Sequence, residues 1–106
     1  MQTVLLRGSD FDPVIASHAI RFHERLLGRW SPSALDATLI DTKTVHTFGL
    51  KESIGVVGID EHLTVVAAAR LEPNHIVRFR KARYILELPE DFDLPAVGSA
   101  LEMSYV

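Results

Sequence analysis

Apolar residues recur at every second position over most of the chain after residue 33. Successive side chains of a strand point to opposite faces, so this alternation is typical of half-buried strands. It predicts strands at 36–41, 44–50, 54–60, 63–71, 75–79, 83–88 and 100–105. A weaker alternation over 2–7 predicts a short first strand.

One segment near the N-terminus follows a helical pattern instead. Asp12 can cap free backbone N–H groups, and Pro13 loses no hydrogen bond at the first helical position. The apolar residues that follow recur at four- and three-residue steps and form one stripe: Ile15, Ala19, Phe22 and Leu26. Gly28 is a suitable residue just past a helix end. We therefore expect a helix over 13–27 with this stripe against a sheet.

Two further patterns refine the predicted sheet. The strand at 54–60 is apolar on both faces, which predicts a central strand covered on both sides and paired in an antiparallel hairpin with 63–71. Between 75 and 88 the apolar positions change from odd to even, as a single regular strand cannot do. We expect a bulge or a bend near Arg80–Ala82.

Many short strands with one helix predict a mainly β fold of the α+β class. The expected architecture is an antiparallel β-sandwich or a partly open barrel, with the N-terminal helix packed on the sheet. The 106 residues fit a single domain over 1–106, because two independent cores would each be marginal in size.

Composition excludes several classes of function. There is no cysteine, which excludes a disulfide scaffold, a Cys-ligated metal site and a thiol nucleophile. A net charge of −3 disfavours non-specific nucleic-acid binding. No apolar run suits a signal peptide or a membrane helix, so a soluble, cytoplasmic protein without membrane partners is expected. Nucleotide-binding glycine loops and a nucleophile elbow are missing, and no cofactor is expected.

The segment Thr-Val-His-Thr-Phe-Gly-Leu at 44–50 belongs to a wider pattern. With Ile-Gly-Val-Val-Gly-Ile-Asp at 54–60 and Ala-Arg-Tyr-Ile-Leu-Glu-Leu-Pro at 82–89, it resembles the family called domain of unknown function 192. The segments at 25–29 and, less well, 97–102 extend the resemblance. It implies a compact, mainly β domain found in bacteria and archaea, and it implies no established activity.

The chain departs from the family pattern at several positions. Relatives usually have Phe-Pro in place of Glu52-Ser53, an aspartate in place of Gly55 and a bulky residue in place of Gly58. A hairpin glycine is replaced by Leu63, and an aspartate of the closing segment by Ser99.

His46 is the first candidate for chemistry. On a strand it shares a face with Phe48 and Leu50, where a half-buried imidazole can serve as a base or a ligand, or be held in place by hydrogen bonds. The neighbouring Thr47 points to the other face and is a further binding candidate.

Glu87 is the second candidate, on the face of its strand opposite Tyr84. A carboxylate there is usually solvated or paired with a cation on the next strand. Arg78 and Arg80, in a local group of cations, are the expected partners and further binding candidates.

Metal binding is not expected. His18 and His23 lie about 140° apart around a helix, so they do not readily share one ion. Asp60, Glu61 and His62 adjoin at a predicted turn, where such residues commonly gather without a metal.

These observations favour a non-catalytic module that binds a small ligand or a protein. The alternatives are a hydrolase-type enzyme, with His46 as the base and Glu87 or Asp60 as its orienting group, and a structural homo-oligomer such as a homodimer.

Overall fold

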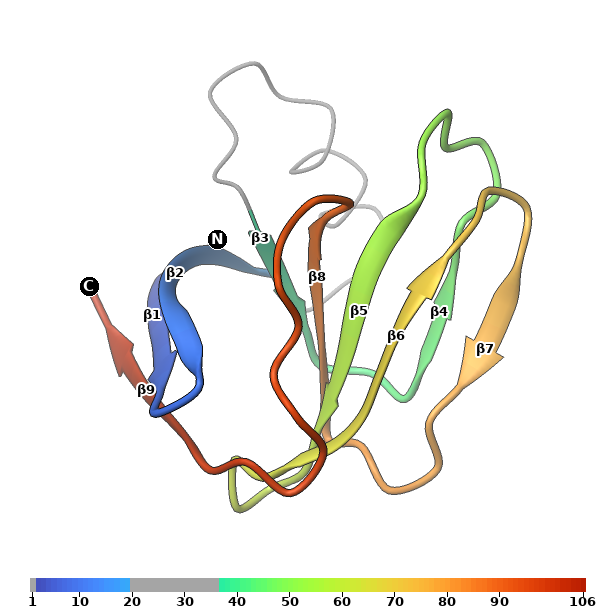
Figure 1. The fold of residues 1–106 in the computed structure, drawn as a ribbon. Coiled ribbons are helices and arrows are strands. Elements are labelled where there is room, and N and C mark those ends of the chain that lie inside the picture. The colour runs from blue at the N-terminus through green and yellow to red at the C-terminus, as the bar shows by residue number, and fades with distance from the viewer. Residues whose placement is uncertain (1, 20–36) are drawn as a thin grey trace.

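The computed structural model describes residues 2–19 and 37–106, which form nine strands (Figure 1). In chain order the strands are β1 (Gln2–Gly8), β2 (Phe11–Ala19), β3 (Ala37–Ile40), β4 (Thr44–His46), β5 (Ile54–Ile59), β6 (Val65–Leu71), β7 (Ile76–Arg78), β8 (Tyr84–Pro89) and β9 (Leu101–Tyr105). This part of the chain contains no helix, and hence none that could cross a membrane. The described fold is therefore all-β.

Seven of these strands form one curled sheet in the order β6-β5-β8-β3-β2-β1-β9, and β4 and β7 form a separate pair. All neighbours are antiparallel except β2 and β3, which run parallel from Ala16↔Ala37 to Ala19↔Ile40. The expected purely antiparallel arrangement is thus wrong at this pair. The large sheet is mixed and bends into a half-barrel (Figure 1).

The expected helix over 13–27, and with it the α+β class, is wrong. Over 13–19 the chain belongs to strand β2, which pairs with both β1 and β3; residues 20–27 lie outside the described residues. Val14 and Ala16 are buried while Ile15 between them is 47% exposed, which is a period of two. Pro13 lies where the register with β1 shifts, a place where a strand tolerates a missing N–H.

The eight predicted strands all coincide with observed ones, although their ends differ. The largest difference concerns 44–50, where β4 ends at His46 and the chain turns through Gly49 at a φ of 80°. The bend expected near Arg80–Ala82 is confirmed by a turn in which the Ala82 N–H donates to the Phe79 carbonyl. This turn takes the chain from the β4–β7 pair to the large sheet, which explains the change of apolar phase.

The large sheet separates two apolar clusters. The main cluster fills its concave side, with Val4, Leu6, Leu39, Leu86 and Leu88 among its buried members. A smaller one lies on the other side of β5 and β8, where Ile54, Val56 and Ile85 meet Val45 and Val77 of the strand pair β4–β7. Strand β5 is buried at every position, as predicted for a strand covered on both faces.

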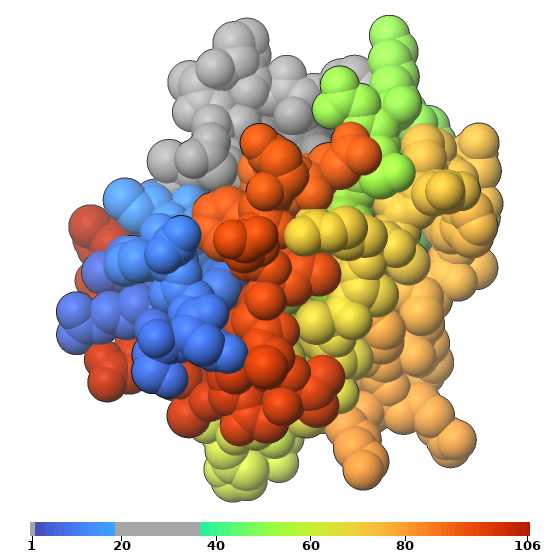
Figure 2. Space-filling view, in the orientation of Figure 1, coloured from blue at the N-terminus to red at the C-terminus, as the bar shows by residue number. Residues whose placement is uncertain are grey.

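The two edges of the curled sheet meet at one end. Thr64 and Ala100 form an isolated antiparallel bridge, flanked by hydrogen bonds from the Val65 N–H to Ser99 and from the Leu101 N–H to Leu63. In Figure 2 residues 90–100, orange to red, occupy the space between the β1–β2 hairpin and β6. The backbone contacts link the start of β6 to the segment that leads into β9.

Two glycines of β5, Gly55 and Gly58, lie where neighbouring side chains leave little room for a Cβ. A Cβ at Gly55 would lie 2.8 Å from Leu94 Cδ2, so Leu94 occupies the space that a side chain would need. A Cβ at Gly58 would lie 3.0 Å from Phe79 Cδ2. Glycine at position 55 therefore leaves room for Leu94 of the 90–100 segment. Glycine at position 58 leaves room for Phe79, which precedes the turn before β8.

The β5–β6 hairpin turns at Leu63, which has a φ of 63°. This left-handed conformation favours glycine, because a Cβ raises its energy by about 1–2 kcal/mol. Asp60 holds the turn by accepting hydrogen bonds from the backbone N–H groups of His62 and Thr64, both at 2.9 Å. Leu63 is partly buried against the main core, and this contact offsets the strain.

The free energy of unfolding of Leu63→Gly is expected to be about 1 kcal/mol higher than that of Leu63→Ala. Both variants lose the leucine contact, and only glycine relieves the left-handed strain. Urea denaturation of the two variants measures the difference. At an ordinary strand position a glycine variant is less stable than an alanine variant. If Leu63→Gly were less stable than Leu63→Ala, the left-handed conformation of residue 63 would be contradicted.

Candidate functional site

The His46 side chain is half-buried at the end of β4, opposite Ile76 of β7. Its ring stacks on Phe48 at 5.0 Å, and its Nδ1 accepts a hydrogen bond from the Phe48 N–H at 3.3 Å. The expected apolar neighbour is thus present, while Phe48 itself is 52% exposed.

Thr47 is fully buried, and its hydrogen bonds join the turn after β4 to the turn between β6 and β7. Its hydroxyl donates to the Glu72 carbonyl at 2.6 Å and accepts from the His75 N–H at 2.8 Å. Its backbone N–H donates to His75 and its carbonyl accepts from Asn74. These contacts commit Thr47 to the structure of the β6–β7 turn.

Glu87 has no exposed surface, which contradicts the expectation of a solvated or surface-paired carboxylate. It lies in the middle of the large sheet, between Thr38 on β3 and Val56 on β5. The expected cation partners lie elsewhere. Arg78 is exposed and faces Thr44 within the β4–β7 pair, and Arg80 is exposed in the turn after β7.

Asp60 was expected as an orienting group for His46 in the hydrolase alternative. Its Oδ1 instead accepts the two N–H groups of its own hairpin turn. Its side chain therefore serves the turn.

The structure assembles a different cluster around His18 on β2. The His18 Nε2 lies 2.5 Å from Asp41 Oδ1, and its Nδ1 lies 3.2 Å from the Tyr105 hydroxyl. With Asp41 ionised, Nε2–H donates to the carboxylate, and Nδ1 accepts the Tyr105 O–H. We call His18, Asp41, Arg83, Tyr84 and Tyr105 the His18 cluster.

Arg83 and Tyr84 complete this cluster from the start of β8. Arg83 Nη2 lies 3.4 Å from the second Asp41 oxygen, and the guanidinium carbon lies 4.8 Å from the centre of the Tyr84 ring. The His18 ring stacks on Tyr105 at 6.0 Å and meets the edge of Tyr84 at 6.1 Å. His18 is buried, whereas about half of the Arg83 side chain and of Tyr105 is exposed.

The strand pairing brings these residues together at one end of the concave side. His18 pairs with Leu39 across the parallel β2–β3 ladder, and Asp41 follows two residues later. On the other side His18 pairs with Gln2 of β1, whose Val4 pairs with Tyr105. Four strands or their ends thus supply the cluster.

Sequence reasoning missed this cluster because it placed His18 on a helix. On a strand, His18 follows Val14 and Ala16 on the inward face, and it is the polar residue at the end of this apolar alternation. That alternation was the available signal. No group of three or more metal-ligating side chains occurs within residues 2–19 and 37–106.

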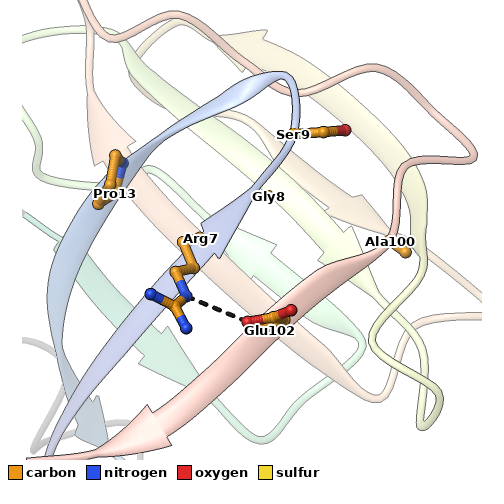
Figure 3. Close-up of a pocket in the computed structure, with 6 residues that line it drawn as sticks. All are labelled: Arg7, Gly8, Ser9, Pro13, Ala100 and Glu102. Carbon is orange, nitrogen blue, oxygen red and sulfur yellow. Dashed lines mark hydrogen bonds and ion pairs between the residues drawn. The ribbon is translucent and has the colours of Figure 1, made fainter.

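Two open clefts lie elsewhere on the surface. One, of about 490 Å³, is lined by Arg7, Gly8, Ser9, Pro13, Ala100 and Glu102 (Figure 3). In it the exposed Arg7 and Glu102 form an ion pair at 3.1 Å. The other, of about 640 Å³, is lined by Glu52, Ser53, Arg70, Pro89, Glu90 and Asp91. Both are formed mainly by turn and surface residues.

Asp10 ties the β1–β2 turn to the 90–100 segment beside the first cleft. The Ser99 hydroxyl donates to its carboxylate at 2.9 Å and the Ala96 N–H at 3.2 Å. These bonds, the first more than the second, lower the pKa of Asp10 below its ordinary value. The stability they contribute is present above the ordinary pKa and is lost as the pH falls through the lowered one.

Comparison with known proteins identifies similar folds but no family. No family model and no curated protein matches the chain. A "putative transcription regulator" from Sinorhizobium meliloti 1021 has a TM-score of 0.69 at 17% identity, covering 96% of this chain and 92% of its own. A protein of unknown function from Novosphingobium aromaticivorans DSM 12444 has a TM-score of 0.69 at 14% identity, covering 94% and 83%. At these identities the similarity establishes a shared fold, that of a small, β-rich domain.

Proposed function

We propose that this protein is a small-molecule-binding domain whose ligand occupies the end of the half-barrel at the His18 cluster. The observation that carries the proposal is the convergence there of five polar or aromatic side chains on the rim of an apolar core. Ligand sites are often found at the mouths of β-barrels, where an apolar wall meets a few placed polar groups. A binding module was also expected from the sequence, but at other residues.

The ligand chemistry that we propose follows from the exposed groups of the cluster. Tyr105 is 54% exposed, so its ring offers surface beyond its contact with His18. Arg83 is also half-exposed and offers hydrogen-bond donors. Its ion pair with Asp41 makes it part of the same cluster. These groups suit a small aromatic molecule with an oxygen substituent.

We further propose that the chain belongs to the domain of unknown function 192 family. Leu63 supports this, because its left-handed backbone occupies the position where relatives have a hairpin glycine. The transcription-regulator description belongs to the S. meliloti protein. At 17% identity the likeness concerns the fold, and the net charge of −3 does not favour nucleic acid.

Titration of the ¹⁵N-labelled protein with 4-nitrophenol tests the binding function. We expect saturable amide shifts centred on His18, Arg83, Tyr84 and Tyr105. Tyr105→Ala should weaken binding at least about tenfold, because a ring contact contributes on the order of 1.5 kcal/mol.

Phe48→Ala is the matched control, since Phe48 is an equally exposed aromatic residue that also stacks on a histidine. It should leave the affinity unchanged. Shifts centred on Phe48 and His46, or the absence of saturable shifts at the His18 cluster, would refute the proposed site.

A further inference from the structure

One ion pair and two hydrogen bonds connect four side chains of the His18 cluster in series. Arg83 holds one oxygen of Asp41, the other oxygen meets His18 Nε2, and His18 Nδ1 meets the Tyr105 hydroxyl. A hydroxyl within reach of a base that is itself oriented by a third group is the arrangement that activates nucleophiles in enzymes. Here the hydroxyl belongs to an exposed tyrosine and the base is buried.

We propose that Tyr105 is a nucleophile toward small acyl esters, with His18 as its general base. The inference rests on the proposed binding site and goes beyond it, by assigning that site a covalent reaction. It belongs to the hydrolase class, with residues different from the His46, Glu87 and Asp60 expected from the sequence.

The reaction has two steps. In the first, the Tyr105 oxygen forms a bond to the acyl carbon while its proton passes to His18 Nδ1, and the bond from the acyl carbon to the leaving oxygen breaks. The leaving group departs as an alkoxide or phenoxide, and His18 gives its proton to this group or to bulk water and becomes neutral again. In the second, water attacks the acyl carbon of the acyl-tyrosine while its proton passes to His18 Nδ1, and the bond from the acyl carbon to the Tyr105 oxygen breaks. His18 then returns the proton to the Tyr105 oxygen, which releases the carboxylic acid and restores both residues.

Asp41 and Arg83 act as positioning residues. The Asp41 carboxylate fixes the His18 proton on Nε2, which leaves Nδ1 as an acceptor directed at Tyr105. It also stabilises the imidazolium that forms when Tyr105 is deprotonated. The Arg83 contact holds the other oxygen of Asp41 and thereby its orientation.

Acylation by 4-nitrophenyl acetate tests the proposal, with peptide mapping by mass spectrometry to locate the acetyl group. Tyr84 and Tyr105 are the two tyrosines of the chain, so Tyr84 is an internal control. We expect Tyr105 to be acetylated about 100-fold faster than Tyr84, the lower end of what a general base contributes.

Three variants separate activation from structure. Tyr105→Phe removes only the hydroxyl and should abolish acetylation at this position. His18→Gln should lower the Tyr105 rate by about 100-fold. Asp41→Asn should lower it and change its dependence on pH, a readout that a purely structural role would leave unmoved. Amide spectra of each variant verify that the sheet is intact.

The proposal is overturned if Tyr105 is not acetylated, if it reacts no faster than Tyr84, or if a folded His18→Gln variant reacts at the wild-type rate. Its failure is distinguishable from failure of the binding function. Saturable binding of 4-nitrophenol without acetylation of Tyr105 would refute only the nucleophile, whereas fast His18-dependent acetylation without such binding would refute only the proposed aromatic ligand.

Discussion

Leu86→Ala is expected to lower the free energy of unfolding by about 3 kcal/mol. Leu86 is fully buried on β8, where it pairs with Leu39 on one side and Val57 on the other. Both neighbours belong to the same apolar cluster, so the lost methyl groups leave a cavity in the middle of the concave core. Urea denaturation monitored by circular dichroism measures the change.

Ile76→Ala is the control for this prediction. Ile76 lies on β7 and is 62% exposed, so its truncation should change the free energy of unfolding by less than about 0.5 kcal/mol. Equal effects of the two substitutions would contradict the position of β8 at the centre of the sheet.

Thr47→Val is expected to lower the free energy of unfolding by about 2 kcal/mol. The substitution keeps the shape of the side chain but removes the hydroxyl that bonds both Glu72 and His75. The β6–β7 turn would lose two of the hydrogen bonds that hold it in place. Thermal denaturation of the variant, analysed as a two-state transition, gives the change in stability.

Thr64→Val serves as the matched substitution. Thr64 is half-buried beside the Asp60 turn and enters its hydrogen bonds through its backbone N–H and carbonyl groups. Its replacement should alter stability by less than about 0.5 kcal/mol. An equally small change in the free energy of unfolding for Thr47→Val would show that the Thr47 hydroxyl does not stabilise the β6–β7 turn.

The strands after residue 36 could be predicted from sequence because each has one face against an apolar cluster. Residues 83–88 illustrate this, since Leu86 and Leu88 face the concave core. The change of apolar phase before Tyr84 also revealed the turn at Arg80–Ala82. Alternation alone did not indicate that β4 and β7 form a separate pair, because the register of a strand does not specify its partner.

The error at 13–19 arose from a segment that satisfies two periods at once. Asp12-Pro13 and the stripe beginning at Ile15 fit a helix, yet Val14, Ala16 and His18 also fit the inward face of a strand. Pairing with β1 and β3 decides the outcome, since it places this segment between two hydrogen-bonded neighbours. Tertiary context of this kind overrides local helix signals.

The candidate site could not be predicted because its residues are distant in sequence and depend on strand order. His18 and Tyr105 meet because β9 follows β1 at the edge of the sheet, and His18 and Asp41 meet because β2 and β3 are parallel. The left-handed conformation of Leu63 could not be predicted either, because a leucine gives no local signal for a positive φ.

Nuclear Overhauser contacts between the ring protons of His18 and those of Tyr105, in the uniformly labelled full chain, test the central claim most directly. The strand position of residues 11–19 and the edge position of β9 together predict observable contacts, because the ring centres lie 6.0 Å apart. A His18 ring with no contact to Tyr105, and with contacts along a helical segment instead, would contradict both the sheet order and the site.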